Sequence, residues 1–122
     1  MTAETLMIVG RVVFGAFFVI AGIRNVAGFS DRMSRPTNYD WFLPKPVMAL
    51  GFALQLLAGL CLVADIETAA AAMALIVFLL VATPLYHNPL MFAPKERAPH
   101  LYLMLVNVTL AAGLLLVIAN AL

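Results

Sequence analysis

Charged residues are scarce in this chain of 122 residues: they make up 11% of it, whereas hydrophobic residues make up 65%. Soluble domains carry roughly 25% charged residues, because a surface that faces water must be polar. A small globule also has too much surface for its volume to hide this much apolar side chain inside. The excess apolar surface must therefore face lipid, which makes the chain an integral membrane protein.

Cysteine is nearly absent as well. A single residue, Cys61, excludes an internal disulfide and a Cys-x-x-Cys redox pair, and we expect it to be a buried, unreactive hydrophobe. The net charge of +1 comes without a basic stripe, so nucleic acid is not an expected partner. The N-terminus, Met-Thr-Ala-Glu, lacks the basic residues of a signal peptide, so no cleavable one is predicted.

Four apolar segments are long enough to cross a membrane. A helix that spans a hydrocarbon core of about 30 Å needs about 20 mostly apolar residues. Segments 5–23, 47–64, 68–86 and 101–119 qualify, and only the first contains a charge. Lipid requires each backbone N–H and C=O to be satisfied within its segment, which favours helices over strands. The sequence therefore predicts one all-α domain, a bundle of four transmembrane helices.

The connections between these segments differ in character. Residues 65–67 suffice only for a tight turn, so the second and third helices should form an antiparallel hairpin. The loop 24–46 mixes charges with aromatic residues, and we expect it to lie along the membrane surface with a short helix. The loop 87–100 contains three prolines, which discourage regular structure.

Basic residues predict the orientation, because they are retained on the cytoplasmic side of a membrane. Loops 24–46 and 87–100 hold or adjoin six of the seven, whereas the termini and the 65–67 turn have none. We therefore expect both long loops in the cytoplasm and both termini outside. The six residues are Arg24, Arg32, Arg35, Lys45, Lys95 and Arg97.

Acidic residues are missing from all four segments, and no pair of nucleophile and base, phosphate loop or cluster of metal ligands occurs. An enzyme that acts alone is therefore not expected. Proton-coupled export of cations, as in the small four-helix multidrug exporters, is also not expected, because it relies on a carboxylate within the first helix. His87 and His100 are too few and too far apart in the sequence to indicate zinc or haem.

Arg11 is the ionisable residue within a predicted span, and such residues are candidates for function because they are costly to insert. It shares a helical face with Gly15 and Gly22, whose small size lets another helix approach closely. Two interpretations stay open. Arg11 binds an anion or a polar headgroup near the outer leaflet, or it reaches the interface or hydrogen-bonds to carbonyl groups and polar side chains.

Three polar residues in the other spans are further candidates. Gln55 lies between Gly51 and Gly59 at helical spacing, which is typical of close packing with an interhelical hydrogen bond. It is alternatively a contact for a carbonyl group or a quinone ring. Asn107 is similar, and the two amides could bond to each other.

His87 follows Thr83 by one helical turn, with Pro84 loosening the helix between them. A histidine in this position can donate to a quinone oxygen, relay a proton or bind a metal, since its charge changes near neutral pH. It is alternatively an interfacial residue without a ligand.

Four short motifs together resemble the DoxX family of small bacterial and archaeal membrane proteins, over nearly the whole chain. Residues 11–24 read RVVFGAFFVIAGIR, residues 54–60 read LQLLAGL, residues 81–87 read VATPLYH, and residues 107–115 read NVTLAAGLL. The resemblance implies a four-helix bundle in the cytoplasmic membrane, associated with respiratory or redox systems. Gln55 is a departure, since the family usually has Glu in this segment, and Arg11 then lacks its expected ionic partner.

Two functions are expected from these observations. The first is a redox-associated subunit, such as part of a membrane oxidoreductase, that binds quinone or lipid through Arg11, Gln55, His87 and Asn107. The second is an assembly or chaperone-like subunit that docks on other membrane proteins or on further copies of itself. The substrate and the route of electrons do not follow from the sequence.

Overall fold

The computed structural model covers all 122 residues and contains helices but no strands. Four helices are long and apolar enough to span a membrane, which confirms the predicted all-α membrane bundle. Helix α4 has the bounds predicted for the third segment, whereas α1 and α5 extend two to four residues beyond each predicted end. The long helices are α1 (Ala3–Ala27), α3 (Lys45–Ala64), α4 (Thr68–Tyr86) and α5 (Arg97–Ala121).

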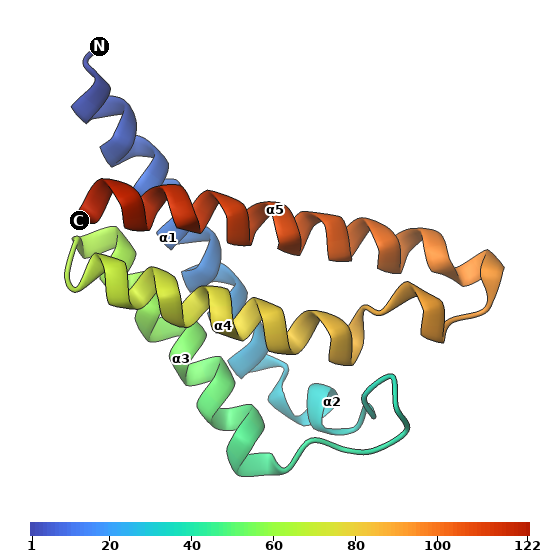
Figure 1. Ribbon diagram of the computed structural model, residues 1–122. Helices are drawn as coiled ribbons and strands as arrows, with labels where there is room; N and C mark the ends of the chain where they lie inside the picture. Colours follow the sequence, from blue (N-terminus) through green and yellow to red (C-terminus); the bar gives the residue numbers. More distant parts are fainter.

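The long helices pack in chain order: α1 lies on α3, α3 on α4, and α4 on α5. Figure 1 shows α4 and α5 running side by side and crossing the pair formed by α1 and α3. Helices α1 and α5 meet only over a short stretch, and the first turns of α1 project away from the other helices (Figure 1). The bundle is therefore two helix pairs joined at α3 and α4, with its fourth side partly open.

Glycines bring α1 and α3 into backbone contact. A Cβ atom added at Gly15 would lie 2.8 Å from the carbonyl oxygen of Gly59, and one at Gly59 would lie 2.9 Å from the backbone nitrogen of Val19. Gly22 is packed in the same way against Leu56. Lipid provides no hydrophobic drive for two helices to associate, so close packing of this kind holds them together.

The turn between α3 and α4 depends on two residues with left-handed backbone conformation, Asp65 (φ 57°) and Glu67 (φ 48°). The backbone N–H of Ile66 donates to the carbonyl oxygen of Cys61 over 2.9 Å, which ends α3. The hydroxyl of Thr68 donates to the carboxylate of Asp65 at the start of α4. These contacts confirm the predicted antiparallel hairpin.

The core of the bundle is small, and most apolar side chains point outward. The largest fully buried side chains are Phe18, Leu62, Leu75 and Leu114. Leu114 is the one buried residue of α5, whereas Leu116 of the same helix is 74% exposed. An outward apolar surface of this extent is what a helix in lipid requires.

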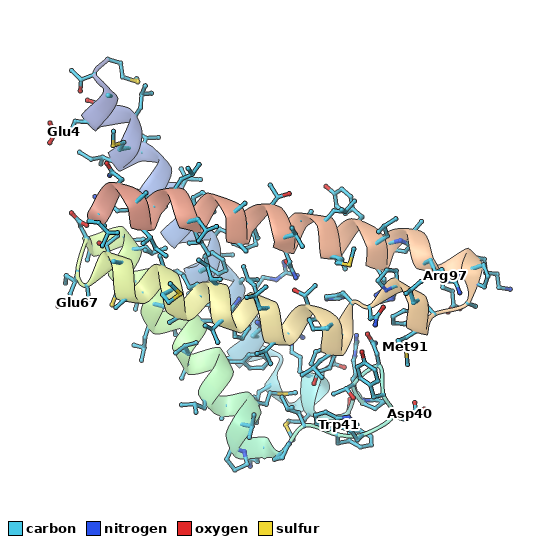
Figure 2. The ribbon with its side chains drawn as sticks, in the orientation of Figure 1. Glu4, Asp40, Trp41, Glu67, Met91 and Arg97 are labelled. Carbon is cyan, nitrogen blue, oxygen red and sulfur yellow. The ribbon has the colours of Figure 1, made fainter.

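The two long loops lie together at the end of the bundle away from the termini. Figure 2 shows Asp40, Trp41, Met91 and Arg97 there, while Glu4 and Glu67 lie at the opposite end. The first loop contains the expected short helix, α2 (Phe29–Met33), and two of its aromatic residues, Trp41 and Phe42, are exposed. Aromatic side chains favour the headgroup layer, so this surface suits an interfacial position.

The expectation of little regular structure in the loop 87–100 is partly wrong. Two short 3-10 helices, η1 (Pro89–Met91) and η2 (Pro94–Glu96), each begin at a proline, and Pro99 lies in the first turn of α5. Proline is tolerated at such positions because the first N–H groups of a helix have no partner within it, and its fixed φ suits a helix start. The prolines therefore start these helices.

The glycine contact gives a first prediction. Gly15→Val should lower the free energy of unfolding in detergent by about 1–3 kcal/mol, because its side chain would enter the backbone of α3. Gly10→Val is the matched control, since a Cβ atom at Gly10 meets nothing within 4 Å. Thermal or denaturant unfolding followed by circular dichroism measures both variants. Equal stability of the two would show that α1 and α3 do not pack through Gly15.

Candidate functional site

Arg11 lies where α3 ends. Its Nη1 donates to the carbonyl oxygens of Leu62 (2.6 Å) and Val63 (3.2 Å), and its Nε lies 3.7 Å from the carboxylate of Asp65. The last carbonyl groups of a helix have no partner within it, and a cation is favourable near them. One of the two interpretations from the sequence, hydrogen bonding to carbonyl groups, therefore describes the contacts that Arg11 makes.

These contacts also fix the level of Arg11 within the bundle. It is level with the turn between α3 and α4, because it bonds to the last residues of α3. Its side chain is 14% exposed, and its Nη2 makes no hydrogen bond within the protein. Arg11 therefore has Asp65 as an ionic partner and keeps one free donor group, at Nη2.

Gln55 belongs to a different cluster, between α1 and α3 near the loops. Its Oε1 accepts a hydrogen bond from Nδ2 of Asn25 (2.7 Å), and Oδ1 of Asn25 accepts one from Nε of Arg32 (3.1 Å). Gln55 is 5% exposed, so this chain of side chains joins a buried amide to an arginine of α2. Gln55 and Asn107 therefore do not bond to each other, because Asn107 is paired with Thr83.

Asn107 and His87 lie at the same cleft, between α4 and α5. Nδ2 of Asn107 donates to the hydroxyl oxygen of Thr83 over 3.0 Å. Asn107, Thr83 and His87 line a cleft of about 380 Å³, whose other lining residues are mostly apolar. Thr83 is 7% exposed. The cleft thus combines apolar walls with four polar side chains, those of Thr83, His87, Asn88 and Asn107.

His87 and His100 are brought together by the loop between α4 and α5. Their Nδ1 atoms are 3.3 Å apart and their ring centres 5.5 Å apart. Ring centres this far apart, with the two Nδ1 atoms this close, require both nitrogens to lie between the rings. Nδ1 of His87 therefore faces Nδ1 of His100. A hydrogen bond between them requires one Nδ1 to donate and the other to accept.

His100 lies in the first turn of α5 and is held in place by the loop that precedes this helix. The ring of His100 stacks on Phe92, with ring centres 3.6 Å apart and planes inclined by 9°. The carbonyl oxygen of Phe92 accepts a hydrogen bond from Nε of Arg97 over 3.0 Å. No group of three or more His, Cys, Asp or Glu side chains is arranged around a common point.

The structure divides the four predicted site residues among three places. His87 and Asn107 share the cleft between α4 and α5, Gln55 lies between α1 and α3, and Arg11 lies at the end with the termini. Sequence reasoning missed Asn25 and the pairing of His87 with His100. Asn25 lies one turn after Gly22 on the face that contacts α3, and continuing that face beyond residue 23 would have found it.

The comparisons with known proteins agree with this architecture. The sequence profile of the DoxX family matches residues 6–88, which cover α1 to α4 but neither α5 nor Asn107. No curated protein matches the chain. No solved structure matches it either. The family match covers more than half of the chain and includes three of the four motifs, so the chain belongs to the DoxX family.

Proposed function

We propose that the chain binds the head group of a quinone in the cleft between α4 and α5. The observation that carries this proposal is the cleft itself, about 380 Å³ in volume, with His87, Thr83 and Asn107 on its lining. Ligand sites are typically concave, mostly apolar and supplied with a few polar groups that fix the orientation of the ligand. A flat ring with carbonyl oxygens fits this combination.

The donors in the cleft suit a carbonyl oxygen. The hydroxyl of Thr83 accepts from Asn107 and has no acceptor for its own hydrogen within the protein. That hydrogen and an N–H of His87 are the groups that would hold the oxygen, while Leu79, Leu80 and Val108 flank the ring. A group that can neither donate nor accept would leave these donors unpaired, which costs binding free energy.

A quinone supplies an exchange of two electrons and two protons when it is bound. The chain's own contribution is the histidine pair, in which Nδ1 of His87 faces Nδ1 of His100. His87 borders the cleft and His100 does not. A proton taken up by His87 on the side of the cleft is therefore passed on through His100 toward the loops.

Electrons have to come from or go to a partner, since the chain has one cysteine and no cluster of metal ligands. We therefore place the protein in a larger membrane assembly with a redox function, in the cytoplasmic membrane of a bacterial or archaeal cell. The loops 24–46 and 87–100 face the cytoplasm in this proposal. Six of the seven basic residues lie in or beside them.

The open packing of the bundle favours a second candidate function, that of an assembly subunit. Helix α5 touches α4 and, briefly, α1, and it buries Leu114 alone. Its remaining face is available to other membrane proteins or to another copy of the chain. A protein that stays monomeric and without partners in mild detergent would contradict this second candidate.

The quinone site is tested by removing its amide. Asn107→Leu should lower the amount of quinone that co-purifies in mild detergent about five- to tenfold, because Thr83 loses its hydrogen-bond donor and the cleft loses a polar group. Extraction and chromatography of the retained quinone measure this amount. Asn120→Leu, the same change at an exposed position of α5, should leave it unchanged. If neither the wild type nor the variants retain a quinone, the proposal fails.

The orientation is tested with reporters. A reporter that is active only in the cytoplasm should be inactive when it is fused to Leu122 and active when it is fused after Ala93, within the loop 87–100. The physical reason is the concentration of basic residues in the two long loops. Activity of the Leu122 fusion would reverse the proposed orientation.

A further inference from the structure

The side of the bundle between α1 and α5 contains a second and larger cavity. It is an open groove of about 1,010 Å³ at the end of the molecule where both termini lie. Its apolar walls include Met7, Ile8 and Phe14 of α1, and Leu116 and Val117 of α5. The groove exists because the first turns of α1 diverge from α5 (Figure 1).

Charges of both signs border this groove. Arg11 lies in its lining, and Nη2 of Arg11 has no hydrogen-bond partner in the protein. Glu4, Asp65 and Glu67 belong to the lining as well, and Glu4 and Glu67 form no ion pair. Figure 2 shows both glutamates at this end of the molecule. One cation and three carboxylates give the groove a net charge of −2.

We propose that this groove binds a phospholipid whose headgroup carries a primary ammonium, such as a phosphatidylethanolamine. Nη2 of Arg11 donates to the phosphate, and the ammonium pairs with the carboxylates of the turn beside Arg11, Asp65 and Glu67, while Glu4 adds negative charge at the outer end of the groove. The acyl chains leave the groove beside Phe14, on the side of Arg11 away from the N-terminus, and extend into the bilayer. This site is separate from the cleft between α4 and α5, so the inference does not rest on the quinone proposal.

The position and the charge of the groove select this class of lipid. Arg11 is level with the turn between α3 and α4, where the headgroups of a bilayer begin. A lipid with a net negative headgroup, such as phosphatidylglycerol, would meet three carboxylates and one arginine. The quaternary ammonium of phosphatidylcholine has no N–H to donate, whereas a primary ammonium donates to carboxylates.

The experiment is native mass spectrometry of the full chain in mild detergent. It uses an equimolar mixture of phosphatidylethanolamine, phosphatidylcholine and phosphatidylglycerol with identical acyl chains. The wild type should retain phosphatidylethanolamine about threefold over each of the others, the size expected of exposed charge pairs. The double variant Glu4→Gln, Glu67→Gln should lose this preference, since neither glutamate makes a contact that the fold needs.

Glu96→Gln is the matched control, because Glu96 is an exposed glutamate at the opposite end of the molecule and forms no ion pair. It should keep the threefold preference. Circular dichroism of each variant confirms that the helices are intact. Equal retention of the three lipids, a preference for phosphatidylglycerol, or a preference that persists in the double variant would each overturn the proposal. Displacement of all lipid by a second copy of the chain would overturn it too, and would make the groove a dimer interface.

Discussion

The backbone contact between α1 and α3 is the constraint on which the polar sites depend. In lipid, two helices associate through close packing, and Gly15 and Gly59 allow their backbones to meet. The register of this contact brings Arg11 to the last carbonyl groups of α3. It also brings Asn25 to Gln55 near the other end of the helix pair. Two polar clusters therefore follow from one packing interface, and a slip of one helix against the other would break both.

The second helix pair, α4 and α5, is held by different means. Asn107 bonds to Thr83 between the helices, and the loop that joins them brings His87 to His100. Because the two pairs cross and meet chiefly through α3 and α4, α1 and α5 diverge at the end where the termini lie. The same arrangement therefore leaves a small, mostly apolar cleft between α4 and α5 and a larger groove between α1 and α5.

Hydropathy predicted the four spans because lipid imposes length and apolarity on each helix by itself. The bounds of α4 were predicted as well, since a tight turn precedes Thr68 and His87 follows the last apolar turn. The partners of Gln55 and His87 were not predicted, because a partner depends on helix register and on loop geometry. Asn25 lies beyond the predicted end of the first span, and Phe92, which stacks on His100, lies in a loop expected to be irregular.

The resemblance to the DoxX family leads one to expect Glu at position 55, and the structure holds an amide there. Asn25 offers an N–H to Oε1 of Gln55, and Arg32 in turn donates to Asn25. The same donors would hold a carboxylate, so the interface between α1 and α3 accepts either residue. With Gln55 in place, this interface has no group that changes its charge near neutral pH. The two histidines of the chain lie instead beside the other helix pair, where His87 borders the cleft and faces His100.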